Sequence, residues 1–159
     1  MQLFVVRHGI AEDAELGQPD AERELTKQGR RKIRQVVKGL RAIDVSFARV
    51  LTSPWTRALQ TAKLLGPVSN ADPIVTELLA QQPRAELLSV LADAADTTAV
   101  VGHEPWLGEL VAWLAFGDTR HHHSLELKKG GVVWLDGHTI PGGMKIRALL
   151  PAKIAGSLH

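Results

Sequence analysis

The sequence opens with an uninterrupted apolar run at residues 3–6 (LFVV). A strand with one face in solvent alternates apolar and polar residues, so this run predicts a strand that is covered on both faces. Residues 99–101 (AVV) form a second run of the same character. Stretches with the spacing of amphipathic helices separate the predicted strands. This alternation predicts an α/β fold, a three-layer αβα sandwich with a mostly parallel central sheet and helices on both faces.

Local signals give the expected bounds of several elements. Thr26 has the residue type and position of an N-cap for a helix of about 15 residues. Ser53 is expected to cap a second helix whose first position is Pro54, and Gly66-Pro67 is expected to end it. Further strands are expected within 45–52, 73–75, 99–101, 124–127, 132–135 and 144–150, and further helices over 85–95 and 105–116.

The chain has 159 residues, of which 45% are hydrophobic, and this suffices for one domain with a sizeable core. We expect a single domain over residues 1–150 and a loosely held tail over 151–159. The sequence contains no cysteine, which excludes disulfides, thiol catalysis and cysteine-based zinc sites.

The charge balance gives no strong reason to expect a nucleic-acid or membrane partner, because the net charge is only +2. The N-terminus has no basic segment followed by a long apolar stretch, and no apolar run approaches the roughly 18 residues of a membrane span. We therefore expect a cytoplasmic protein that binds neither nucleic acid nor membranes.

Charged and titratable residues follow three of the predicted strands. Arg7 and His8 end the first, Arg57 lies shortly after the second, and His103 follows the fourth. Open α/β sheets bind their ligands at the carboxyl ends of the strands. Two histidines and two arginines at such positions predict a pocket for a phosphoryl group.

His8 is the candidate nucleophile, because a neutral imidazole can attack phosphorus and hold the phosphoryl group covalently. A histidine at a strand end is more often structural, but Arg7 beside it and Gly9, which permits close backbone approach, favour function. Arg7 and Arg57 offer planar, bidentate donors for phosphoryl oxygens. Arg57 stands in the first turn of a predicted helix, where a cation is unfavourable unless an anion binds there.

The remaining candidates are less specific. His103 is expected to donate to a phosphoryl oxygen, although it would also suit a structural position before a helix. Trp55 and Trp106 are expected in the core or at the mouth of the site.

Residues 121–123 (HHH) resemble a metal-binding tract, but consecutive side chains point in different directions, so a solvated loop is favoured. Lys128-Lys129 could extend the positive surface toward an acidic partner, but a solvated pair is the simpler reading.

Three motifs in order resemble those of the histidine phosphatase superfamily, which contains phosphoglycerate mutases and small phosphatases. The compact length, residues 20–26 (DAERELT) with Gly29, and residues 102–105 (GHEP) are most similar to the SixA-type protein phosphohistidine phosphatases. The motifs are Arg7-His8-Gly9, Thr52-Ser53-Pro54 with Arg57-Ala58 and Gln60-Thr61-Ala62, and Gly102-His103.

The resemblance implies that His8 is the nucleophile and that Arg7, Arg57 and His103 form the phosphate pocket, with Ser53 as a further substrate contact. It also implies an αβα domain without a metal or other cofactor. The expected function is that of a phosphatase that forms a phosphohistidine intermediate and dephosphorylates phosphohistidine on a signalling protein. One alternative is a phosphomonoesterase for a small phosphorylated metabolite, and another is a phosphate-dependent binding module without turnover.

The proton donor is left open by the sequence. Glu77 lies where many superfamily members place a glutamate after the third strand, and a solvated carboxylate is an equally good interpretation. Asp20 is the rival, as an acid or as a group that orients water or substrate. Ester hydrolysis needs an acid, because an alkoxide is a poor leaving group. An imidazole leaving group protonated on its own ring has less need of one, so a poorly placed acid would favour phosphohistidine as substrate.

Overall fold

The computed structural model describes residues 1–93 and 96–158 and contains a six-stranded sheet with the order β3-β2-β4-β1-β5-β6. The four strands β3, β2, β4 and β1 run parallel, whereas β5 and β6 are antiparallel to their neighbours. The predicted α/β fold with a mostly parallel sheet is confirmed. The strands are β1 (Gln2–Arg7), β2 (Arg49–Thr52), β3 (Ile74–Val75), β4 (Thr97–Gly102), β5 (Val132–Gly137) and β6 (Met144–Leu150).

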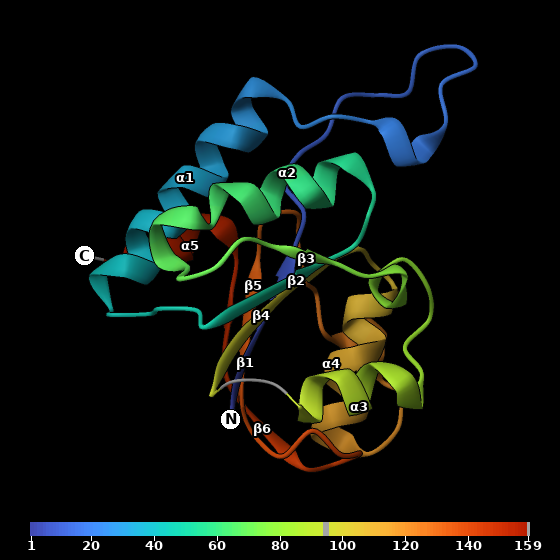
Figure 1. The fold of residues 1–159 in the computed structure, drawn as a ribbon, viewed down its shortest axis with the longest axis vertical. Coiled ribbons are helices and arrows are strands. Elements are labelled where there is room, and N and C mark those ends of the chain that lie inside the picture. The colour runs from blue at the N-terminus through green and yellow to red at the C-terminus, as the bar shows by residue number, and fades with distance from the viewer. Residues whose placement is uncertain (94–95, 159) are drawn as a thin grey trace.

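Helices cover both faces of the sheet (Figure 1). Strand β1 shows why: Phe4 and Val6 pack into one buried cluster, while Leu3 and Val5 pack into the other. Each of these side chains is at most 1% exposed, as the unbroken apolar run predicts. One cluster packs under α1 (Lys27–Ala42), α2 (Thr56–Leu64) and α5 (Ala152–Ala155), and the other under α3 (Ala85–Ala92) and α4 (Trp106–Phe116).

The two predicted helix starts have different outcomes. Thr26 is the N-cap of α1, and its side chain accepts a hydrogen bond from the backbone N–H of Gly29, as expected. The cap assigned to Ser53 is wrong, because α2 begins at Thr56 and its N-cap is Trp55. Residue 55 is still extended, so the helix starts later than Pro54 suggested. The Ser53 hydroxyl instead accepts from the Trp55 N–H and lies 2.8 Å from Nε2 of His103.

The strand expected at 124–127 is absent from the described part of the chain. Residues His122–Ser124 form a 3-10 helix (η4), and the chain then runs without a strand to β5. Leu127 is buried in the core, and its carbonyl accepts a hydrogen bond from Nη1 of Arg7. The apolar alternation there reflects packing against the core rather than pairing in the sheet.

The C-terminal segment is packed up to its last described residues, rather than loosely held as expected. Helix α5 buries Ala155 completely against α1. A Cβ at Gly39 of α1 would collide with the Ala155 carbonyl, so a glycine allows this close approach. The domain boundary at residue 150 stays a prediction.

Two further expectations concern the ends and the length of helices. The helix expected over 85–95 ends at Ala92, and residues 94–95 lie outside the described part of the chain. Within residues 1–93 and 96–158, no helix combines the length and the apolar character needed to cross a lipid bilayer.

Candidate active site

Strand pairing brings the three sequence motifs together. Arg7 at the end of β1 is in register with Gly102 at the end of β4, and Thr52 at the end of β2 is in register with Val101. The backbone N–H of His8 then donates to the Gly102 carbonyl at 3.1 Å. Residues far apart in the chain therefore leave the sheet at one edge, as expected for a ligand site in an open α/β fold.

A pocket of about 340 Å³ lies at this edge. It contains Arg7, His8, Arg57, His103 and Asp20 from the predicted set, and Trp55 and Trp106 lie at it as expected. Its full lining is Arg7, His8, Asp20, Arg23, Trp55, Arg57, His103, Glu104, Trp106 and Lys129.

Two predicted residues do not line the pocket. Ser53 lies behind it and contacts the His103 ring. Glu77 is exposed at the start of the 3-10 helix Glu77–Leu79 (η3) and is not among the described residues that line the pocket. Its role as a proton donor stays a prediction without geometric support.

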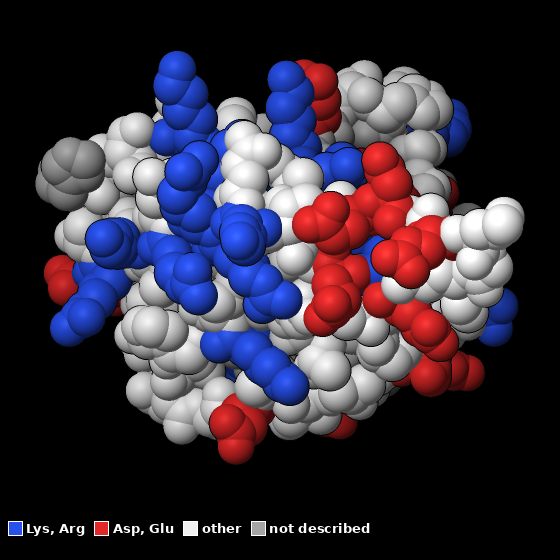
Figure 2. Space-filling view, turned by 90° about the horizontal axis from the view of Figure 1, so that it is seen from above, with Lys and Arg blue, Asp and Glu red and all other residues white. Residues whose placement is uncertain are grey.

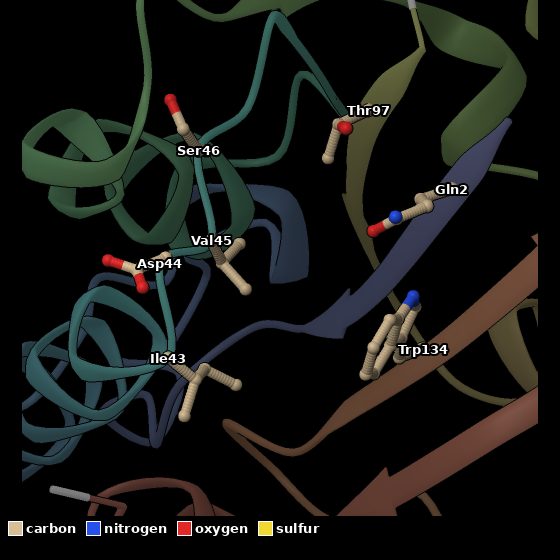
Figure 3. A pocket seen from close by; sticks show the side chains of 7 residues that line it. All are labelled: Gln2, Ile43, Asp44, Val45, Ser46, Thr97 and Trp134. Carbon is tan, nitrogen blue, oxygen red and sulfur yellow. The ribbon is translucent and has the colours of Figure 1, made fainter.

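A larger cavity, of about 520 Å³, lies where β1 and β4 begin (Figure 3). Gln2 and Thr97 border it from the sheet, and Asp44 is the one ionisable residue among its described lining. It lacks the paired histidines and arginines of the smaller pocket, so size alone does not locate the phosphoryl site.

The hydrogen bonds of His8 fix its tautomer. Nδ1 lies 2.7 Å from the Gly9 carbonyl oxygen, which can only accept, so Nδ1 carries the proton. Nε2 therefore holds the lone pair and accepts a hydrogen bond from Nε–H of Arg57 at 3.2 Å. The ring is 5% exposed and borders the pocket. Nε2 is thus the nitrogen whose lone pair can attack a phosphoryl group once the hydrogen bond from Arg57 is released.

The environment keeps both site histidines neutral at pH 7. Burial lowers the pKa of His8 to about 4, and the charges of Arg57, Arg7 and Lys129 act in the same direction against the opposing hydrogen bond to Gly9. Burial also lowers the pKa of His103 to about 3. A neutral imidazole keeps the lone pair that nucleophilic attack requires.

Arg57 is held by one partner on its outer side. Nη1 donates to the Asp20 carbonyl at 2.7 Å and Nη2 to the Asp20 carboxylate at 2.9 Å. Its guanidinium also lies 4.9 Å from the ring centre of Trp55. Hydrogen bonds from Arg23 and Arg57 lower the pKa of Asp20, so this carboxyl is ionised at neutral pH. Asp20 is therefore placed to orient Arg57 and is a poor proton donor.

Arg7 and His103 retain polar atoms with no partner among the described residues. Nη1 of Arg7 donates to the Leu127 carbonyl at 3.0 Å, while its Nε is buried and unpartnered. Burial lowers the pKa of Arg7. Nδ1 of His103 is likewise buried without a partner in the part of the chain that is described. Buried polar atoms are normally paired, so Arg7 and His103 are exceptions, and both residues lie in the lining of this pocket.

Glu104 and Arg23 also line the pocket, and the sequence argument named neither as a candidate. The Glu104 carboxyl is the acid of the two. Its Oε1 accepts from the backbone N–H of Gly108 at 2.7 Å, which holds the carboxyl in place. Burial raises its pKa, against the opposing effects of that hydrogen bond and of Arg7. The sequence does contain a signal for it. Glu104 directly follows His103, which was selected because it comes just after a strand, and the same reasoning applies to Glu104.

The histidine tract forms no metal site in the structure. The rings of His122 and His123 lie 4.4 Å apart. Over residues 1–93 and 96–158, no group of three or more histidine, cysteine, aspartate or glutamate side chains is arranged to hold a metal ion.

The low histidine pKa values predict that stability falls in mild acid. The unfolded rings take up protons near pH 6.5, whereas the folded rings do so only near 4 and 3. Between these values the unfolded state binds more protons, so the free energy of unfolding decreases as the pH falls, by about 1 kcal/mol per pH unit for each histidine and roughly 2 kcal/mol per pH unit for the two together. Urea unfolding at pH 6.0 and 5.0 measures this slope. It should be smaller in the double variant His8→Asn/His103→Asn, and an equal slope in that variant would assign the effect to other groups.

Comparison with known proteins identifies the class of this protein. Residues 3–82 match the model of the histidine phosphatase superfamily (branch 1). The chain is 40% identical over 143 residues to an uncharacterised protein from Picosynechococcus sp., covering 85% of this chain and 84% of that protein. It is 34% identical over 128 residues to the phosphohistidine phosphatase SixA of Escherichia coli, covering 75% and 77% of the two chains.

A solved structure of the protein histidine phosphatase SixA complexed with tungstate has a TM-score of 0.79 to this chain at 27% identity, and the match covers 96% of this chain and 98% of that one. The chain therefore belongs to the histidine phosphatase superfamily and is a phosphatase. Within that superfamily it is a SixA-type member.

Proposed function

We propose that this phosphatase removes the phosphoryl group from phosphohistidine on another protein and carries it transiently on His8. The observation that supports this most directly is the His8 ring itself. Its Nδ1–H is tied to the Gly9 carbonyl, so its lone pair on Nε2 borders a pocket that also contains Arg7 and Arg57.

In the first step, the Nε2 lone pair of His8 forms a bond to phosphorus while the nitrogen–phosphorus bond of the substrate breaks. The departing imidazole keeps the bonding electron pair and takes up a proton. Phosphorylated His8 carries positive charge on its ring, which the hydrogen bond from Nδ1 to Gly9 stabilises. Arg7, Arg57 and His103 bind the phosphoryl oxygens through the transition state.

In the second step, water attacks the phosphorus of phosphorylated His8. The bond from Nε2 to phosphorus breaks, inorganic phosphate leaves, and the water proton ends on phosphate or solvent. His8 returns to its neutral form with the proton on Nδ1. Neither step requires a cofactor.

Neither of the two acids that the sequence offered supports an ester substrate, which leaves Glu104 as the remaining candidate donor among the described pocket residues. Asp20 is ionised by its arginine partners, and Glu77 lies outside the pocket, so neither is well placed to protonate an alkoxide. A phosphohistidine substrate has less need of such an acid. Kinship with SixA of Escherichia coli, whose name states phosphohistidine phosphatase activity, supports the same choice.

Supplying the protein with different phosphoryl donors tests this proposal against the alternative of a small phosphorylated metabolite. We expect faster release of phosphate, as kcat/KM, from a phosphohistidine peptide than from sugar phosphates, nucleotides or p-nitrophenyl phosphate. Label transferred to the protein should be acid-labile, as a nitrogen–phosphorus bond is. Preferred hydrolysis of a sugar phosphate or nucleotide would establish the alternative, and binding without turnover of any donor would establish a phosphate-binding module.

Glu104 is the residue whose substitution should separate the two substrate classes. Its raised pKa and its place in the pocket suit it to protonate an ester leaving group. We expect Glu104→Gln to lower hydrolysis of a sugar phosphate, whose alkoxide leaving group needs a proton, by about 10²-fold, the contribution typical of a general acid. Hydrolysis of a phosphohistidine peptide should change much less.

The control is Glu77→Gln, measured on the same two substrates. Glu77 is exposed outside the pocket, so we expect this variant to retain both activities. A larger loss of ester hydrolysis in Glu77→Gln than in Glu104→Gln would assign the acid to Glu77, as the sequence argument suggested.

A further inference from the structure

The face that contains the pocket carries strongly segregated charge. Viewed onto the carboxyl ends of the parallel strands, lysine and arginine side chains gather on one side and aspartate and glutamate on the other (Figure 2). The chain as a whole is nearly balanced, with a net charge of +2. The separation is therefore a property of this surface rather than of the composition.

Helix α1 carries a row of cations that begins at that face and runs along the helix away from it (Figure 1). Its sequence contains lysine and arginine but no aspartate or glutamate. Five exposed cations recur at alternating intervals of four and three residues, the spacing that places side chains along one side of a helix. This cationic stripe spans about 21 Å at 1.5 Å per residue. Its members are Lys27, Arg31, Arg34, Lys38 and Arg41.

The cationic stripe does not serve the stability of α1. Like charges at these intervals repel, and Lys27 in the first turn is disfavoured by the helix dipole, which offsets the favourable place of Arg41 in the last turn. None of the five forms an ion pair with any residue in the described part of the chain. The helix is held instead by its buried side, which includes Ile33 and Leu40. The exposed cations are thus available to an outside partner.

The opposite side of the face is an acidic segment, residues 12–24. Glu12, Asp13, Glu15 and Glu22 are exposed and form no ion pair with the residues that the structure describes. Leu16 within the segment is fully exposed and offers an apolar contact.

Both charged elements adjoin the pocket. Asp20 and Arg23 of the acidic segment form part of its lining. On the other side, the first turn of α1 rests on the chain just after His8, because the Thr26 N–H donates to the Ile10 carbonyl at 2.9 Å. A macromolecule whose phosphoryl group reaches His8 would therefore lie over or beside both.

We propose that the cationic stripe and the acidic segment together dock the phosphorylated partner protein, an inference that rests on the proposed function. The partner would present carboxylates to α1 and cations to residues 12–24, on either side of its phosphohistidine. A uniformly anionic ligand, such as nucleic acid or an anionic bilayer, would meet repulsion from the acidic segment. A surface with both a cationic and an anionic part complements a protein that carries both kinds of charge, and this complementarity fixes the orientation of the bound protein.

Three phosphohistidine peptides of equal length test the docking surface at low salt. The first carries a run of glutamates on one side of the phosphohistidine and a run of lysines on the other. The second carries the glutamate run alone, and the third has glutamine in place of both runs. We expect KM to be lowest for the first peptide, about fivefold lower than for the third, with the second between them and similar kcat for all. Added salt should reduce these differences, because exposed charges are screened.

The variant Arg31→Gln/Arg34→Gln removes two charges from the cationic stripe without changing the pocket. It should reduce the KM advantage that the glutamate run gives, because two of the five cations are lost, and leave hydrolysis of p-nitrophenyl phosphate unchanged. The matched control is Arg84→Gln/Lys145→Gln, which removes two exposed charges from α3's N-terminal end and from β6. Equal KM for all three peptides, or equal effects of the two double variants, would overturn the proposal.

A binding measurement separates this proposal from the proposed function. Fluorescence anisotropy with His8→Ala and unphosphorylated versions of the peptides requires no turnover. Selective binding of the first peptide, weakened in Arg31→Gln/Arg34→Gln on this background, would support docking even if no phosphohistidine peptide were hydrolysed. Tighter binding of duplex DNA or of phosphatidylglycerol vesicles through the same arginines would replace the protein partner by an anionic polymer or membrane.

Discussion

His8→Ala should lower kcat by at least about 10⁴-fold, because it removes the atom that forms the covalent intermediate. The effect is expected with any phosphoryl donor, since Nε2 attacks phosphorus whichever group leaves. Rapid-quench experiments with a ³²P-labelled phosphohistidine peptide should show an acid-labile protein-bound label in the wild type and none in the variant.

The fold should tolerate this change. His8 directly follows β1, and its backbone N–H still donates to Gly102 in the variant, so far-ultraviolet circular dichroism should match the wild type. His138 is an exposed histidine after β5 and away from the pocket lining. His138→Ala is therefore the matched control and should keep full activity. Turnover near the wild-type rate in His8→Ala would refute the covalent route.

The positions of the main site residues could be predicted because they depend on strands. Apolar runs locate β1 and β4, and parallel pairing brings the ends of such strands to one edge of the sheet. Once both strands were identified, the meeting of His8 and His103 followed from the fold class. The structure adds what depends on single contacts, above all the hydrogen bond to the Gly9 carbonyl that assigns the His8 lone pair to Nε2.

The wrong predictions concern side chains that can form hydrogen bonds either with neighbours in the sequence or with residues far away in the chain. Ser53 has the residue type of a helix cap, but its hydroxyl accepts from the Trp55 N–H and contacts His103 across the sheet edge. The acid was harder to predict for a related reason. Whether Glu77 or Glu104 reaches the pocket depends on the path of a loop, and β3, which precedes Glu77, has only two residues, both exposed. No periodic pattern in the sequence records that path.

Arg57→Lys should lower kcat by about 10² to 10³-fold although it preserves the charge. The guanidinium holds the Asp20 carbonyl and carboxylate through Nη1 and Nη2 while its Nε–H contacts Nε2 of His8. A lysine ammonium is a single point of donation and cannot span these partners while also binding two phosphoryl oxygens. The loss should appear mainly in kcat, because the guanidinium of Arg57 stabilises the negative charge that develops on the phosphoryl oxygens in the transition state.

Arg23→Lys is the matched control for that experiment. Arg23 lines the same pocket and pairs with the same Asp20 carboxylate, but it makes no described hydrogen bond to His8. If cationic charge in the pocket were sufficient, both lysine variants would retain activity. If the fork of Arg57 positions the phosphoryl group against Nε2, only Arg57→Lys will show the large loss, while Arg23→Lys stays within a few-fold of the wild type. Equal losses would shift the argument from Arg57 to Asp20, the residue that both arginines hold.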